Sequence, residues 1–283
     1  MELPVWLKRK HSLQILLYAG LLIFVFVALL PFYWLFLASL TPQHQLFSIP
    51  PNYFPDLTLA NFAALTQQIP FSTYLMNSLL FSGGSVLLSV ILSFLAAYGF
   101  ARINVPGSNA LMLILVLSMA LPPIVTVVPL FEVLRSLRMI DSLTGLTLVM
   151  GSVLIPFSVW VLVSFVKRVP VEMEEAAFMD GARLYQVLWY VVVPAMVPAL
   201  VTIIIINFIN AWNNLLFPLV FSHSVSSKTL TVSITEVFQA RTPFGRPWGI
   251  ISALGVTMVM PMIVLVLTAQ KWIVSGLTRG SIK

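Results

Sequence analysis

Four of the chain's nine acidic residues lie in one short polar segment: Glu172, Glu174, Glu175 and Asp180. Carboxylates gathered in this way can bind Mg²⁺, which prefers oxygen ligands, or can form a solvated helical surface. The cations Lys167 and Arg183 flank the cluster, which favours a charge-balanced helix pair. Residues 167–198 read as a short helix, a glycine turn and a second short helix between two apolar stretches. This pattern predicts a water-facing elbow that docks on a cytoplasmic partner.

Other residue types that carry out catalysis are not arranged to do so. The three histidines, His11, His44 and His223, are scattered near the ends of apolar stretches, where interfacial roles are more common than metal binding. The chain has no cysteine, no Gly-x-x-x-x-Gly-Lys-[Ser/Thr] loop and no His-Glu-x-x-His motif. We therefore expect no catalytic centre, no metal site and no cofactor in this chain.

The composition indicates an integral membrane protein. Of 283 residues, 59% are hydrophobic and 8% are charged, whereas a soluble domain has about 25% charged residues. The net charge is +6, with a pI near 9.8. Because the basic residues lie at the ends of apolar stretches, we interpret them as topology signals and expect no nucleic-acid partner.

Six apolar stretches are long enough to cross a bilayer, which takes about 20 residues. They are residues 13–40, 73–101, 109–131, 145–166, 190–221 and 248–272. Lipid cannot satisfy open backbone groups, so these stretches are predicted to be helices. Strands of a closed barrel would alternate in polarity. The predicted fold is an all-α integral membrane protein with six spans: a cytoplasmic segment 1–12, then a transmembrane domain 13–283 with an elbow at about 167–190 between spans four and five.

The cations predict the orientation of the chain. With the N-terminus inside, ten of the fifteen Lys and Arg residues fall on the cytoplasmic side and five fall outside, so both termini are expected to be cytoplasmic. The predicted spans contain no charged residue apart from Lys271, at the very end of the last one. Carriers driven by protons or ions usually keep such residues at mid-membrane, which argues against self-powered transport and leaves a passive channel or a transporter powered by another protein.

Two further segments have two open interpretations each. Amides inside a span tend to face protein or a water-filled path. The fifth predicted span contains four residues that could either form the wall of a translocation pathway or bind helices together: Asn210, Trp212, Asn213 and Asn214. The loop 222–247 is shaped by Pro and Gly. Its tip could be a plain connector or a contact surface for a partner: Arg241, Thr242, Pro243, Phe244, Gly245 and Arg246.

The elbow resembles the conserved cytoplasmic loop of ABC importer permease subunits. The resemblance is carried by Glu175-Ala176-Ala177, Asp180-Gly181-Ala182, Pro194 and Pro198. Three more segments are similar to carbohydrate importers of the maltose type, and in particular to their smaller six-span subunit: Ser39–Pro51 with Asn61-Phe62, Asn210–Phe217 and Gly276–Lys283. One departure is Asn214, where an acidic residue is common.

This resemblance implies a set of partners. A second, different permease subunit would form a heterodimer with this chain, two ATPase subunits would bind ATP and Mg²⁺, and an extracytoplasmic solute-binding protein would deliver a sugar. The chain itself would be a non-catalytic subunit of the bacterial inner membrane. The alternatives are a permease for a non-sugar solute, or an autonomous channel or secondary carrier.

The resemblance also implies roles for individual residues. Contact with the ATPase would involve Glu174, Glu175, Ala176, Ala177, Asp180, Gly181 and Ala182. The loop tip Arg241–Arg246 would contact the binding protein, and Asn210 to Asn214 would line the sugar pathway. The tail 273–283 would enter the interface between the two ATPases through Thr278, Arg279, Gly280 and Lys283.

Overall fold

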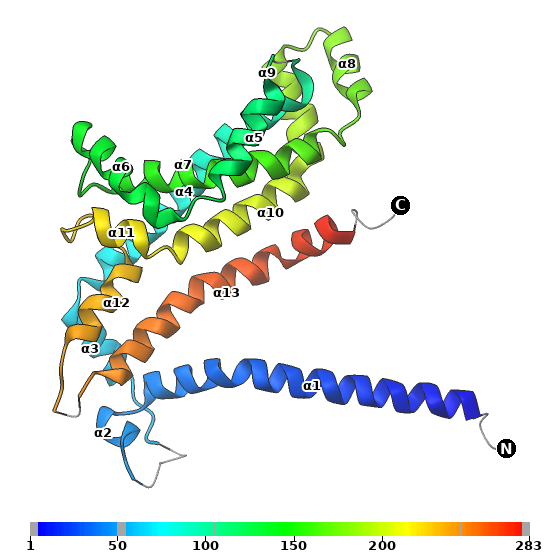
Figure 1. Ribbon diagram of the computed structural model, residues 1–283. Coiled ribbons are helices and arrows are strands. Elements are labelled where there is room, and N and C mark those ends of the chain that lie inside the picture. Colours follow the sequence, from blue (N-terminus) through cyan, green and yellow to red (C-terminus); the bar gives the residue numbers. More distant parts are fainter. Residues whose placement is uncertain (1–4, 50–54, 105, 244, 279–283) are drawn as a thin grey trace. The chain divides into compact units, whose positions relative to one another are not determined.

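The computed structural model describes residues 5–49, 55–104, 106–243 and 245–278. Within these ranges the regular structure is helical, apart from one isolated bridge between Thr242 and Gly245. The predicted all-α fold is confirmed (Figure 1). The chain divides into two compact units, one formed by residues 1–68 and 237–257 and the other by residues 69–236 and 258–283.

Five helical segments are long and apolar enough to cross a membrane. They lie in α1 (Val5–Leu40), α4 (Phe71–Arg102), α7 (Leu143–Val166), the segment Leu184–Trp212 that ends in α10 (Val193–Trp212), and α13 (Trp248–Thr278). A sixth span is available if the bent pair α5 and α6 counts as one. The predicted number of six spans is therefore consistent with the structure.

The third predicted span is not the continuous helix that was expected over residues 109–131. It is two helices, α5 (Ser108–Ser118) and α6 (Pro123–Ser136), whose axes differ by 105°. The chain turns just before Pro122 and Pro123. Proline has no backbone N–H and disfavours a helical conformation in the residue before it, so this pair ends α5 and begins α6.

The fifth predicted span also ends earlier than expected. It was predicted to reach residue 221, but α10 ends at Trp212 and a separate short helix, α11 (Leu216–Phe221), follows. The side chain of Asn214 accepts a hydrogen bond of 3.1 Å from the backbone N–H of Phe217. This bond satisfies a donor in the first turn of α11 and stabilises the break between the two helices.

Small residues bring α4 and α7 close together. α4 buries a row of serines spaced three or four residues apart: Ser78, Ser82, Ser85, Ser89 and Ser93. Two of these hydroxyls donate across to α7, Ser85 to the Thr147 carbonyl at 3.2 Å and Ser93 to the Ile155 carbonyl at 3.4 Å. At Gly151 a Cβ atom would lie 2.7 Å from the Leu88 side chain. Close backbone approach through small residues is a common way for helices to associate in lipid.

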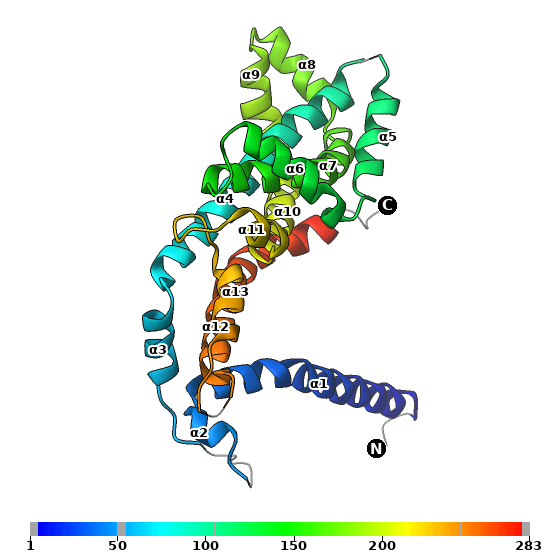
Figure 2. The same cartoon turned by 60° about the vertical axis from the view of Figure 1, so that its left-hand side comes forward.

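One hydrophobic cluster joins α4, α7 and α10 at the end nearest residues 167–190. Its buried members include Phe94, Tyr98, Leu162, Val166, Val192, Met196 and Ile203. Figures 1 and 2 both show α10 running beside α4 and α7. The three spans therefore form one packed body that positions the elbow.

The smaller unit is held together by Asn61. This residue lies in α3 (Ala60–Gln68), and its amide donates to the Ser39 carbonyl at 2.9 Å and the Thr41 carbonyl at 2.8 Å, beside α2 (Gln43–Leu46). A Cβ atom at Gly249 would lie 2.6 Å from the same amide. The first turns of α13 therefore pack directly on Asn61.

Candidate functional site

The predicted elbow is centred on α8 (Val171–Met179), which starts after Pro170. Gly181 ends the helix with a φ of 83°, a conformation that favours glycine. The N–H of Ala182 bonds the Ala177 carbonyl, and the N–H of Gly181 bonds the Phe178 carbonyl, both at 3.0 Å. These two bonds form a Schellman cap, which confirms the predicted glycine turn.

The second short helix of the elbow is not independent, and this part of the prediction is wrong. After Gly181 the chain forms α9 (Leu184–Val187), then the π-helical turn η1 (Leu188–Val192), and continues directly into α10. Together these form one apolar segment of 29 residues, Leu184–Trp212. Pro194 lacks the N–H that a regular helix would use, and the wide π-turn occurs just before it.

The residues of the predicted ATPase contact divide between two faces. Glu174 is buried, and Ala177 and Ala182 pack against the hydrophobic cluster of the spans. The remaining residues of the set are exposed: Glu175, Ala176, Asp180 and Gly181. The structure thus leaves a mixed acidic and small-residue surface open to solvent on one side of α8.

Glu174 makes a buried ion pair with Arg102, the last residue of α4. The Arg102 guanidinium lies 2.8 Å from the Glu174 carboxylate, and the side chains are 13% and 4% exposed. The Tyr98 hydroxyl donates to the other carboxylate oxygen at 2.9 Å. Arg102 also donates to the Val166 carbonyl at 3.0 Å and the Val169 carbonyl at 2.7 Å. We call this set the Arg102 network.

Sequence reasoning missed this network. It treated Arg102 as a topology signal and all four acids of the elbow as solvated. Glu172, Glu175 and Asp180 are exposed as expected, but Glu174 is not. The available signal was the i, i+4 spacing of Tyr98 and Arg102, which places a hydroxyl and a cation on one face of a helix.

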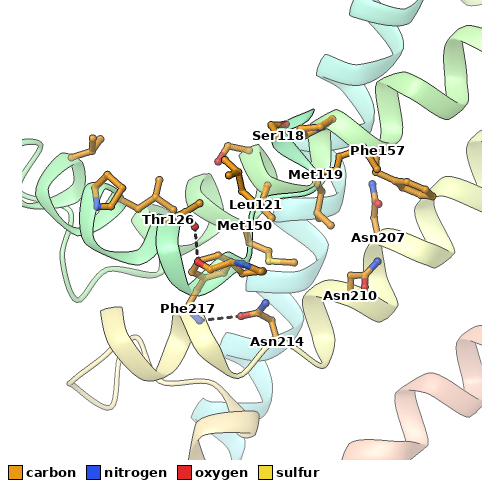
Figure 3. Close-up of a pocket in the computed structure, with 18 residues that line it drawn as sticks. Ser118, Met119, Leu121, Thr126, Met150, Phe157, Asn207, Asn210, Asn214 and Phe217 are labelled. Carbon is orange, nitrogen blue, oxygen red and sulfur yellow. Dashed lines mark hydrogen bonds between the residues drawn. The ribbon is translucent and has the colours of Figure 1, made fainter. Parts of the chain in front are cut away.

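A cavity of about 610 Å³ opens among α5, α6, α7, α10 and α11 (Figure 3). Its polar lining includes Thr126, Asn207, Asn210 and Asn214, and its apolar lining includes Met150 and Phe157. None of the described residues that line it is charged. Amides and hydroxyls beside apolar and aromatic surfaces can bind a neutral solute that bears hydroxyl groups.

Two of the four predicted pathway residues line this cavity and two do not. Asn210 and Asn214 line it, whereas Trp212 is buried and donates from Nε1 to the Met258 carbonyl at 2.9 Å. Asn213 is exposed outside the lining. The prediction missed Asn207, although positions 207, 210 and 214 share one helical face by their spacing.

The predicted outer loop has a defined shape. Thr242 and Gly245 exchange backbone hydrogen bonds of 2.7 and 3.0 Å, and Gly245 has a φ of 91°. The Arg246 guanidinium lies 3.6 Å from the Phe238 ring centre. Arg241, Pro243, Gly245 and Arg246 are exposed and Thr242 is half-buried. Phe244 lies outside the described residues.

Asp141 organises the chain after α11. Its carboxylate accepts hydrogen bonds from the backbone N–H groups of Ser224 at 2.9 Å and His223 at 2.8 Å, and from the Ser227 hydroxyl. The hydrogen bond from the Ser224 backbone N–H, followed by those from Ser227 and His223, holds the pKa of Asp141 well below its usual range. Asp141 is a structural anchor that sequence reasoning did not identify.

The remaining predictions concern the tail and bound ions. Thr278 is the last residue of α13, whereas Arg279, Gly280 and Lys283 lie outside the described residues. Within the described part of the chain, no group of three His, Asp or Glu side chains is placed to hold a metal ion.

The fold and the site define a class of protein, a multi-span membrane subunit with an exposed helical elbow. The family model for binding-protein-dependent transport system inner membrane components matches residues 89–279. The chain belongs to this family, and it is a multi-pass protein of the inner membrane.

Relatives extend the match over nearly the whole chain. The sulfoquinovosyl glycerol transport system permease protein SmoH of Agrobacterium fabrum is 36% identical, covering 90% of this chain and 89% of its own. The trehalose transport system permease protein SugB of Mycobacterium tuberculosis is 35% identical, covering 90% and 93%. A crystal structure of a bacterial ABC transporter involved in alginate import has the same fold, with a TM-score of 0.80, 21% identity, and coverage of 96% of this chain and 100% of that chain.

Proposed function

We propose that this chain is a permease subunit of an ATP-driven importer and that it contacts a partner ATPase through α8. The observation that carries the proposal is the exposed surface of the elbow, with Glu175, Ala176, Asp180 and Gly181 facing solvent. A short helix that displays acids and small residues, and is anchored to three spans from behind, can fit a groove on a soluble partner. Hydrolysis of ATP takes place in the partner subunits, and this chain supplies no catalytic group.

The proposed solute is a sugar or a related polyol or oligosaccharide. Two relatives are named for the transport of sulfoquinovosyl glycerol and trehalose. The uncharged lining of the cavity supports a solute that bears hydroxyl groups, because Asn210 and Asn214 offer amides and Phe157 offers an aromatic face. An amide group can donate a hydrogen bond to one hydroxyl group and accept one from another. Aromatic rings pack on the apolar faces of sugar rings.

The proposed complex contains four other protein components. A second permease subunit completes the translocation pathway as a heterodimer with this chain, and two ATPase subunits bind the two elbows. An extracytoplasmic binding protein delivers the solute, in agreement with the family description. The loop Arg241–Arg246 is the proposed contact for that protein, the tail 273–283 is proposed to enter the ATPase interface, and both termini are proposed to be cytoplasmic.

Two alternatives make different predictions. An autonomous channel or secondary carrier would work without the elbow. A permease for a non-sugar solute would need the elbow but would not respond to a sugar.

The test uses the complex isolated from its native membrane through a tag on this chain. We expect an ATPase to co-purify with this chain. We also expect proteoliposomes that are supplied with the binding protein to show ATP-dependent uptake of a neutral disaccharide such as trehalose, or ATP-dependent solute uptake that such a disaccharide inhibits. Gly181→Pro should abolish ATP-dependent uptake while the chain still inserts, because proline cannot adopt the positive φ that the turn needs. Full uptake by Gly181→Pro would exclude the docking role of α8, and uptake of only non-sugar solutes would exclude the proposed solute class.

A further inference from the structure

The elbow has a single buried residue in α8, and that residue is an acid. Glu174 is 3% exposed, whereas its neighbours Met173 and Glu175 are exposed. Removing a carboxylate from water is costly unless a cation and hydrogen bonds compensate for it. Its position here therefore requires the partners that the Arg102 network supplies.

Arg102 connects three helices at one point. It is the last residue of α4, it bonds Glu174 of α8, and it bonds the carbonyls of Val166, the last residue of α7, and of Val169, in the turn that follows. The last carbonyls of a helix have no partner within that helix and attract cations. The planar guanidinium binds the carboxylate and both carbonyls at the same time, which a single-point cation such as lysine does less well.

The hydrogen bonds of the network fix a direction as well as a distance. Tyr98, one turn before Arg102 in α4, donates to the second oxygen of Glu174, so both oxygens of the carboxylate are held from the same helix. By contrast, the residue of α8 that packs against the hydrophobic cluster of the spans has a small side chain, Ala177. The network is therefore the main directional link between α8 and the ends of α4 and α7.

The link continues toward the cavity. α7 carries Met150 and Phe157, which line the cavity, and α4 packs along α7 through its buried serines. Energetic coupling between distant sites passes through packed helices and hydrogen-bonded networks of this kind.

We infer that the Arg102–Glu174 pair is the positioning element that transmits movement of α8 to α4 and α7, so that the cavity changes its accessibility when the partner ATPase binds nucleotide. This inference rests on the proposed contact between α8 and an ATPase. In the absence of the pair, α8 still offers its exposed face to the ATPase, but its movement is no longer passed to the spans.

A single introduced cysteine can report how accessible the cavity is. It contains no cysteine, and Ser118, which lines the cavity and is exposed, can be replaced by the similar side chain in Ser118→Cys. The measurement is the rate at which a membrane-impermeant maleimide labels this chain in the intact complex, with and without ATP and orthovanadate. This reading needs no knowledge of the transported solute.

Three variants are compared in the Ser118→Cys background. Arg102→Met removes the cation. Arg102→Met combined with Glu174→Leu replaces both partners by apolar side chains, which avoids leaving a buried carboxylate unpaired. Lys167→Met is the matched control, since it removes an exposed cation at the same end of α7.

With the pair intact, and in Lys167→Met, nucleotide should change the labelling rate by about tenfold, a typical size for coupling between two sites. In Arg102→Met and in the double variant this change should fall to less than about twofold, while the ATPase still co-purifies. A full nucleotide response in the double variant would overturn the inference, and so would loss of the ATPase from both variants, since the pair would then serve assembly. Failure of the unmodified complex to contain an ATPase would instead reject the proposed function.

Discussion

Asn207 in α10 and Ser158 in α7 are joined by a hydrogen bond of 2.8 Å that is fully buried between the two spans. The same amide donates to the Ser89 hydroxyl of α4 at 3.0 Å, so one side chain connects three spans. Both of its N–H groups are used, whereas its carbonyl oxygen is buried without a hydrogen-bond partner. Asn207 therefore holds the spans together beside the cavity.

The first prediction follows from this geometry. Asn207→Asp replaces the two donors by a carboxylate in a site with no exposure, and it should lower the free energy of unfolding by about 3 kcal/mol, the usual cost of an acid inside a span. Asn210→Asp is the control, because Asn210 is exposed in the same helix and its amide bonds only the Ile206 carbonyl of its own helix. Thermal unfolding of both variants in detergent measures the difference. Equal losses would show that Asn207 has no special structural role.

Glycine 181 provides a second prediction. A Cβ atom there would meet nothing within 4 Å, so Gly181→Ala is strained only by its φ of 83°, at a cost of about 1–2 kcal/mol. We expect reduced ATP-dependent uptake in Gly181→Ala and partial recovery in Gly181→Asn, since asparagine tolerates this conformation. Gly99→Ala is the control, because Gly99 is helical and equally open. Normal uptake by Gly181→Ala would mean that the turn geometry is not important for transport.

A third prediction concerns pH and Asp141. Its folded-state pKa is held below the unfolded value of about 3.9, so its stabilising effect is complete above that value and is lost as the pH falls toward the folded pKa. The unfolding temperature of the wild-type chain should therefore exceed that of Asp141→Asn by a constant amount from about pH 7 to pH 5. The difference should shrink below about pH 4. Asparagine is chosen because it tolerates the φ of 57° at this position. A difference that does not change with pH would contradict the role of the carboxylate charge.

The outer loop gives a fourth prediction. Arg246→Gln removes the cation from the face of Phe238 but leaves the Thr242–Gly245 pairing in place. If the loop contacts the binding protein, this variant should lower the ATPase activity stimulated by that protein more than it lowers basal activity. Arg135→Gln, at an exposed cation of α6, is the control. Equal reduction of both activities by Arg246→Gln would indicate a plain connector.

Much of the fold could be predicted because the controlling interactions are local. Long apolar stretches identify spans, and Gly181 identifies the turn of the elbow from its neighbours alone. The bend at Pro122 and Pro123 also had a local signal, but the high hydropathy on both sides of the prolines concealed it. The separation of α11 from α10 was missed for a similar reason.

The parts that could not be predicted depend on tertiary contacts. Arg102 and Glu174 are 72 positions apart, and a cation at the end of a span has a sufficient explanation in topology alone. The role of Asn207 depends on serines in two other helices, which the sequence does not place beside it. The neighbouring run Asn-Ala-Trp-Asn-Asn was predicted to line the pathway because it is polar, and that prediction included Trp212, which is buried. Position on one helical face, and not the density of polar residues, decides which amides line the cavity.

The continuity of Leu184–Trp212 has a mechanical consequence. A helix of 29 residues is about 43 Å long, and in this one the first turn adjoins the Gly181 bend while the last two turns carry Asn207 and Asn210. A tilt of only about 5° about its first turn displaces its last turn by about 4 Å, given that length. A small change of direction at the Gly181 bend would thus be amplified along this helix, and it would be largest at the end that carries Asn210.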